Sequence, residues 1–288
     1  MIAGVLGANA HPSGHAHLHR SAHEKRVGGK AKFYKAEKPH IPIPVEAPAF
    51  SAQSVSTPTA EAPAAKPTES APKDKYIPFC GKNGSKKAKR VTKEQVAYKG
   101  NTGIESGCPW NSNMIEIPNS IADMYDYVQT YTNVDKVDYE VRCFNKIGPD
   151  NGLTGMFSVN IDKQLKFTLA PGVTKTLAFE DDTQGVCAFA PKQIPLTSFG
   201  QLAGNWVEFD WVNTSNKGWS GADCSSLVAQ HYDMDVPGCS VCEGSVCSII
   251  HPGGIGENAY TKGMEELDGI GLNIKPGPAT MVIKVGIN

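Results

Sequence analysis

The chain lacks the long apolar run that a transmembrane helix needs, since no uninterrupted stretch approaches about 18 apolar residues. It also lacks an excess of charge: 28 Lys and Arg residues stand against 29 Asp and Glu residues, for a formal net charge of -1. This balance excludes a globally basic nucleic-acid-binding protein and a strongly acidic disordered chain. No glycine-rich phosphate loop is present, and we expect no nucleic acid, membrane, cofactor or resident metal as a partner.

The first residues are similar to the end of a secretory leader, although a charged n-region is missing. Residues 1–10 are mostly small and apolar, and they end in a small-x-small triplet that predicts cleavage after Ala10. We interpret them as the remnant of a signal peptide, with an ordinary disordered terminus as the alternative. Residues 11–38 are His-rich and basic, and they indicate a pro-segment with a dibasic processing site that ends at Arg26.

Residues 39–75 contain Phe50 as their only aromatic side chain and are rich in proline, alanine, serine and threonine. Such a stretch cannot bury enough apolar surface to offset the entropy that is lost when it is ordered. The sequence therefore predicts a disordered N-terminal third that ends in a semi-extended linker. Residues 76–288 are predicted to form one globular domain.

Apolar and polar residues alternate through several segments of this domain, which is typical of half-buried strands. In residues 206–211 the odd-numbered positions are apolar, whereas Trp206, Glu208 and Asp210 share the other face. Further strands are expected at Val137–Cys143, Leu165–Leu169, Thr174–Phe179, Val246–Ile250 and Thr280–Val285. Many short strands separated by Gly- and Pro-rich turns predict a mainly β protein with the architecture of a β-sandwich.

Helix signals are few, and we expect one or two short helices. Ser120 begins a helical repeat that runs into a strand-like stretch at Tyr127–Tyr131, which predicts a short helix followed by a strand. Asn258 is expected to cap a second helix that ends at Gly269.

An even number of cysteines indicates disulfides formed in an oxidising compartment. The eight are Cys80, Cys108, Cys143, Cys187, Cys224, Cys239, Cys242 and Cys247. We expect Cys143 to pair with Cys187, because each lies in a strand-like stretch, and Cys247 to close a short loop with Cys239 or Cys242. A zinc site made by the last three cysteines and Cys224 is the alternative. Sequons at Asn83 and Asn213 predict glycans on surface loops of a secreted, extracellular or cell-wall protein.

Candidate site residues lie on the polar face of residues 206–211. Sugar binding needs aromatic faces and polar groups, which Trp206, Glu208, Asp210 and the nearby Trp219 could supply. Hydrolysis of a glycosidic bond needs carboxyl groups on both sides of that bond. Two acids on one strand face cannot do this alone, so Glu208 opposite Asp223 is the better catalytic pair. Core packing of the tryptophans and simple solvation of the acids are the alternatives.

Several sequence segments closely resemble the secreted fungal allergens of the "Asp f four" type. They are Tyr98–Thr102, Pro109–Ile117, Phe144–Gly155, Gly218–Gly221, Cys247–Ile250, Asp268–Gly271 and Pro276–Pro278. The resemblance spans about residues 96–285 in order. It implies a secreted fungal protein with a cleaved leader, a low-complexity segment and IgE reactivity in sensitised hosts, but it implies no biochemical activity.

A fainter likeness is to thaumatin-like proteins. The segments Phe167–Gly172, Val207–Phe209 and Asp223–Leu227 are similar to the strand-and-turn and acidic-cleft segments of that family. This resemblance implies a thaumatin-like, disulfide-stapled β-sandwich in which Glu208 and Asp223 lie in a cleft that meets β-glucan.

Three hypotheses follow for the function. The first is a non-enzymatic, cell-wall-associated protein that binds β-glucan through Trp206, Glu208, Asp210, Trp219 and Asp223. The second is an effector-like host-interaction protein without sugar affinity. The third is a weak glycoside hydrolase that uses Glu208 and Asp223.

Overall fold

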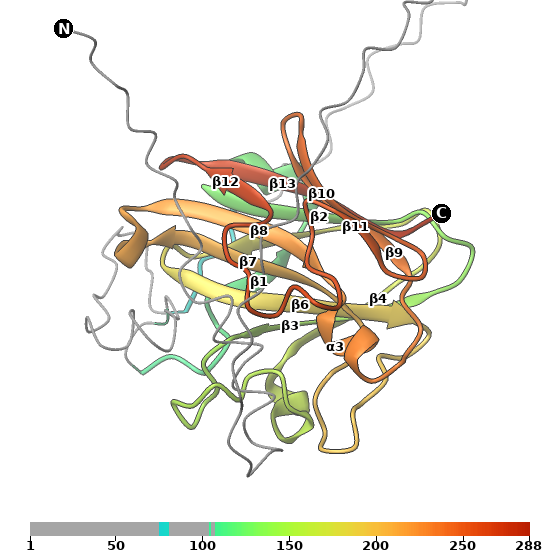
Figure 1. Cartoon of the computed structure of the whole chain (residues 1–288). Coiled ribbons are helices and arrows are strands. Elements are labelled where there is room, and N and C mark those ends of the chain that lie inside the picture. Colours follow the sequence, from blue (N-terminus) through green and yellow to red (C-terminus); the bar gives the residue numbers. More distant parts are fainter. Residues whose placement is uncertain (1–74, 81–103, 105–106) are drawn as a thin grey trace, which may run out of the picture. The chain divides into compact units, whose positions relative to one another are not determined.

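The structure is a computed structural model that describes residues 75–80, 104 and 107–288 (Figure 1). The predicted leader, pro-segment and almost the whole predicted linker lie outside the described residues. So do the predicted sites at Ala10, Arg26 and Asn83. Among the described residues, no helix is both long enough and apolar enough to cross a bilayer.

Two β-sheets make up the described domain, which confirms the predicted mainly β sandwich (Figure 1). The seven-stranded sheet has the order β1 (Met114–Ile117), β5 (Thr174–Phe179), β2 (Tyr127–Asn133), β13 (Ala279–Ile287), β9 (Gly238–Glu243), β10 (Val246–His251) and β11 (Ile255–Glu257). The six-stranded sheet has the order β12 (Leu272–Ile274), β8 (Trp219–Ser225), β7 (Asn205–Asn213), β6 (Thr183–Pro191), β3 (Tyr139–Asn145) and β4 (Leu165–Leu169). Paired strands are antiparallel except β2 and β13, which are parallel. The likeness to thaumatin-like proteins stays a prediction.

The alternation in the sequence sets the two faces of β7. Val207, Phe209 and Trp211 lie in the apolar core between the sheets, as the pattern predicts. Trp211 packs there against Phe179 of β5, with ring centroids 5.8 Å apart. The even-numbered residues of β7 therefore point to the outer face of the six-stranded sheet.

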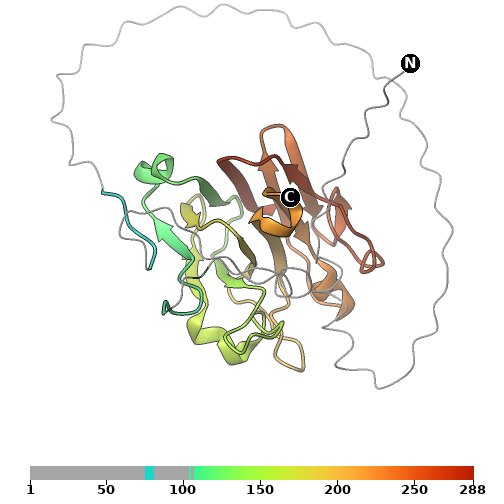
Figure 2. The same cartoon turned by 90° about the vertical axis from the view of Figure 1, so that its left-hand side faces the viewer.

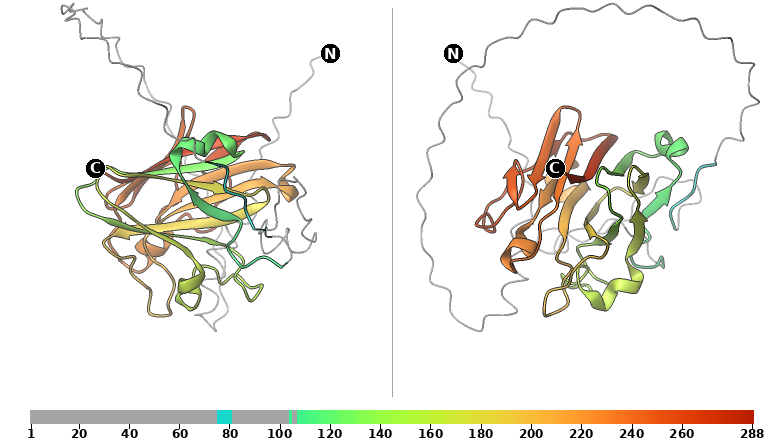
Figure 3. Two further views of the ribbon diagram at one scale, coloured as in Figure 1. Left: turned by 180° about the vertical axis from the view of Figure 1, so that it is seen from behind. Right: turned by 90° about the vertical axis from the view of Figure 1, so that its right-hand side faces the viewer.

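This outer face is covered as well, because β3, β6, β7 and β8 are buried along almost their whole length. Loops and α3 (Leu227–His231) lie on this side of the sheet (Figure 2; Figure 3). A second apolar cluster joins their residues to residues of the sheet. Its members include Phe144, Val186 and Trp206 of the sheet and Met156, Leu202 and Val228 of the covering segments. Polar residues on this face are consequently buried too.

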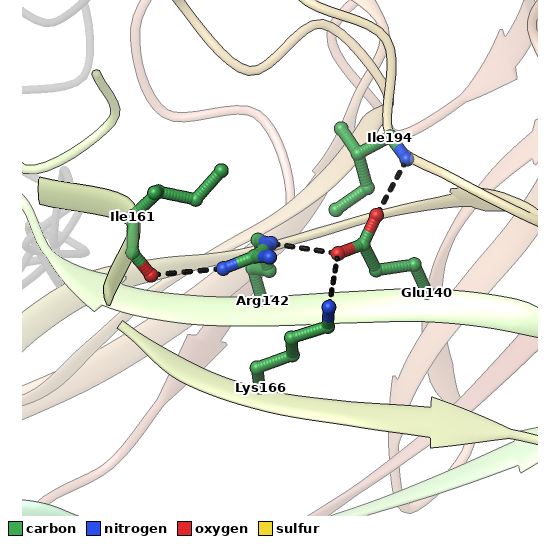
Figure 4. Close-up of polar contacts among 5 residues, drawn as sticks. All are labelled: Glu140, Arg142, Ile161, Lys166 and Ile194. Carbon is green, nitrogen blue, oxygen red and sulfur yellow. Dashed lines mark hydrogen bonds and ion pairs between the residues drawn. The ribbon is translucent and has the colours of Figure 1, made fainter. Parts of the chain in front are cut away.

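A buried ion pair on β3 fastens two of the covering segments to the sheet (Figure 4). Glu140 accepts hydrogen bonds from Arg142 Nε at 2.8 Å and from the Ile194 N–H at 2.9 Å. Lys166 Nζ lies 3.4 Å from the same carboxylate. Arg142 also donates to the carbonyl oxygen of Ile161, in the 3-10 helix η2 (Ser158–Lys163), at 2.9 Å. The pair thus connects the sheet to η2 and to the segment after β6.

The predicted short helix followed by a strand is confirmed, with the 3-10 helix η1 (Asn119–Met124) leading into β2. The helix predicted from Asn258 to Gly269 is wrong, because this segment forms turns. The Asn258 side chain instead donates to the carbonyl oxygens of Cys247 at 3.1 Å and Gly271 at 3.0 Å. The sequence did not predict α3, a single turn, or the 3-10 helix η3 (Thr214–Asn216).

Disulfides staple the described domain, and the predicted pairing of Cys143 with Cys187 is confirmed. The short loop is closed by Cys242 and Cys247, and Cys80 is bonded to Cys108. Because two of its sulfurs are used in this way, the alternative zinc site is not formed. The described part of the chain has no other group of three or more His, Cys, Asp or Glu residues able to hold a metal. Cys224 and Cys239 are separate thiols in the structure, which differs from the expectation that all eight cysteines are oxidised.

Candidate binding site

The structure brings three predicted acids together on the outer face of the six-stranded sheet. Glu208 of β7 lies opposite Asp223 of β8, and Asp210 lies opposite Gln184 of β6. Lys146 follows β3 directly and lines the same small pocket. We call these five residues the acid pocket. Their convergence follows from the strand register, which places same-face residues of neighbouring strands side by side.

Burial dominates the electrostatics of the acid pocket. It lowers the pKa of Lys146 to about 8, although the charges of Glu208, Asp210 and Asp268 counteract this effect. Burial, and then the charge of Glu208, raises the pKa of Asp223 well above its usual range. The site therefore favours a protonated Asp223 beside Glu208.

The size of the acid pocket limits what can enter it. Its volume is about 30 Å³, which is room for about two water molecules. Pockets that enclose small-molecule ligands usually measure about 300–1,000 Å³. Glu208 and Asp223 also rise from adjacent strands on one face rather than from opposite walls of a cleft. The arrangement suits sharing of a proton better than flanking a glycosidic bond.

The tryptophans that were expected beside these acids are arranged differently. Trp206 is 1% exposed and packs edge-on against Phe144, with ring centroids 6.3 Å apart. Its indole face is therefore not open to a sugar. Trp219, at the start of β8, is partly exposed and pairs with Asn213 across the strands. Trp219 is thus the tryptophan of the predicted set that reaches the surface.

Asn213 itself is a poor glycosylation site in the folded domain. Its side-chain amide is buried and donates to the carboxylate of Asp210. A glycan on that nitrogen requires the amide to stand at the surface, so this burial disfavours a glycan at the sequon, and the glycan stays a prediction.

A larger groove lies where the end of β6, residues 233–238 and the end of β13 meet, and its volume is about 820 Å³. Asp135, Asp233 and Asp235 line it together with Tyr139 and four prolines. None of the described residues that line it is Lys, Arg or His. Asp233 and Asp235 are exposed, and the Tyr139 hydroxyl donates to Asp135 at 3.1 Å. We call this the aspartate groove.

No pattern in the sequence predicts the aspartate groove. Its lining comes from segments more than a hundred residues apart, which period and spacing do not connect. The local signal was the Asp233-Met-Asp235 pair ahead of Pro237, two acids in a turn-forming segment. That pattern alone is typical of an ordinary solvated turn.

Fold and site together define a disulfide-stabilised, two-sheet β protein with an acidic groove at one end. Within that class, the chain belongs to the Allergen Asp f 4-like domain family, whose family model matches residues 112–285. This membership confirms the resemblance seen in the sequence.

A curated relative is "Allergen Asp f 4" from Aspergillus fumigatus. It is 36% identical over 195 residues, which cover 66% of this chain and 58% of the relative. The chain therefore spans less than two thirds of the length of that relative. Among solved structures, the protein elicitor MoHrip2 from Magnaporthe oryzae matches with a TM-score of 0.34 and 11% identity, over 56% of this chain and 99% of its own. A similarity of that size supports no argument about fold or function.

Proposed function

We propose that this protein is a secreted, cell-wall-associated protein that binds a neutral β-glucan-type polysaccharide without cleaving it. The observation that supports the proposal best is the aspartate groove, whose volume of about 820 Å³ suits a chain of several sugar rings. Its carboxylates accept hydrogen bonds from sugar hydroxyls, and the prolines present apolar surface to the rings. None of its described lining residues is Lys, Arg or His, and the nearby Lys262 is paired with Asp233 at 3.4 Å, so the groove has no excess of positive charge to attract a polyanion.

Secretion is part of this proposal. Three disulfides in the described domain are typical of an oxidising compartment. The curated relative is named as an allergen, and allergens meet the immune system outside the cell that makes them. We extend the proposal to recognition by IgE, which immunoblots of the folded and the reduced protein with sera from sensitised hosts would test.

Sedimentation with insoluble β-1,3-glucan tests the binding. The full chain is expected in the pellet, and the double variant Asp233→Asn, Asp235→Asn is expected to lose at least about tenfold in affinity, or about 1.4 kcal/mol. Both side chains are exposed, so the fold should not suffer. Asp162→Asn, at an exposed acid of η2 outside the groove, is the matched control and should bind normally. A protein that stays in the supernatant, or a double variant that binds like the parent, contradicts the proposal.

A weak glycoside hydrolase is the second candidate, and one observation favours it. Glu208 and Asp223 are neighbours on adjacent strands β7 and β8, and the raised pKa of Asp223 is what a general acid needs. Release of reducing ends from β-1,3-glucan should then disappear in Glu208→Gln. Release that persists unchanged in this variant rules the candidate out.

A further inference from the structure

Two cysteines meet where the two sheets pack against each other. Cys224 lies in β8 of the six-stranded sheet and Cys239 in β9 of the seven-stranded sheet, and both are completely buried in the core between the sheets. The Cys239 side chain lies close enough to the Cys224 thiol to raise its pKa. The backbone N–H of Cys224 also donates to Ser248 Oγ of β10 at 2.9 Å, which holds β8 against the β9–β10 hairpin. The backbone thus holds the two cysteines as neighbours across the interface between the sheets.

None of the three disulfides in the described part of the chain links one sheet covalently to the other. Cys143–Cys187 joins β3 to β6 within one sheet, and Cys242–Cys247 joins β9 to β10 within the other. Cys80–Cys108 joins two segments that precede β1. A bond between β8 and β9 would therefore add a connection of a different kind, from sheet to sheet.

We propose that Cys224 and Cys239 form a fourth disulfide that joins the two sheets covalently. Formation of this bond removes two protons and two electrons from the thiols. The acceptor is a disulfide of a small thiol or of a thiol oxidoreductase. One cysteine attacks it to give a mixed disulfide, and the second cysteine then displaces the remaining thiol, so that two reduced thiols leave.

Burial determines when this exchange takes place. It raises the pKa of the Cys224 thiol well above its usual range, and the neighbouring Cys239 raises it further. The thiolate is the reactive species, so the closed core suppresses the reaction. The bond must form before the sheets close, and it is then shielded from reductants by the same core.

Thiol labelling of the secreted or oxidatively refolded full chain tests the pairing. After denaturation without reductant, no cysteine should react with N-ethylmaleimide, and a non-reducing digest should yield one linked peptide pair that contains Cys224 and Cys239. Two labelled cysteines at these positions overturn the proposal. A linked peptide that joins either of them to a different cysteine overturns it as well.

Two variants complete the test. Cys224→Ser should leave one reactive thiol, at Cys239, in the denatured chain, which shows that labelling reaches this position. The double variant Cys224→Ala, Cys239→Ala should show a smaller drop in the guanidinium midpoint on addition of reductant than the parent does. An equal drop in both proteins would show that no bond between these residues contributes, contrary to the proposal.

Discussion

Replacement of Arg142 by methionine should destabilise the domain strongly, because it leaves the Glu140 carboxylate buried without its closest cation. The two side chains are 10% and 9% exposed, and their hydrogen bond is 2.8 Å long (Figure 4). Removal of one partner of a buried ion pair costs about 3–5 kcal/mol. Glu140 keeps the Ile194 N–H and the more distant Lys166, so we expect about 3 kcal/mol, a large share of a total stability of about 5–15 kcal/mol.

The double variant Glu140→Leu, Arg142→Met separates the charge effect from packing. Two apolar side chains of similar volume remove both buried charges, so this variant should recover most of the stability that the single variant loses. Guanidinium unfolding at pH 7, followed by tryptophan fluorescence, measures both changes. A single variant within about 0.5 kcal/mol of the parent, or a double variant no more stable than the single one, would refute this reasoning.

The same ion pair predicts a dependence on pH. Burial alone raises the pKa of Glu140, but the Ile194 N–H and the Arg142 and Lys166 cations outweigh it, so the pKa lies below the ordinary value of 4.5. A carboxyl group whose pKa is lowered by folding stabilises the fold above its ordinary pKa and loses this contribution as the pH falls. The parent should therefore lose more stability than Arg142→Met does between pH 6 and pH 3.

Three further predictions concern the outer face of the six-stranded sheet. Because the pKa of Asp223 is raised by folding, its ionisation costs stability as the pH rises above the ordinary value; Asp223→Asn should therefore raise the melting temperature more at pH 8 than at pH 4, and a greater gain at pH 4 would contradict this. Trp206→Ala should cost about 3–5 kcal/mol in urea unfolding, whereas Trp219→Ala should cost less than about 1 kcal/mol, and similar losses would contradict the burial difference. Glycopeptide mass spectrometry of the protein from a glycosylating host should find Asn213 unmodified; substantial occupancy would show that its amide is accessible.

The sequence predicted the parts of the fold that local alternation decides. It separated the core face of β7 from the face of Glu208 and Asp210, and it placed Cys143 and Cys187 in paired strands. Alternation also predicts that the polar face of a strand is exposed to solvent. For β7 this prediction is wrong, because that face is buried. The burial of Trp206 and of the β3 ion pair depends on loops that are distant in sequence, and no period encodes such contacts.

The helices were also predicted poorly from the local sequence pattern, for a related reason. The pattern after Asn258 has helical spacing, but its capping side chain is engaged by the carbonyl groups of Cys247 and Gly271 instead. Conversely, α3 spans only five residues, which is too short for a periodic pattern to stand out. Tertiary contacts override local propensity in both cases.

The strand nearest the end of the sequence, β13, is inserted between β2 and β9 rather than added at a margin. Its parallel partner β2 lies about 150 positions earlier, with Ala279 beside Tyr127 and Val285 beside Asn133. A ribosome must therefore synthesise nearly all of the domain before the middle of this sheet can be completed. Until then, β2 and β9 each expose an open backbone edge that can pair with other chains. The nascent polypeptide therefore most needs chaperones to prevent aggregation during this period.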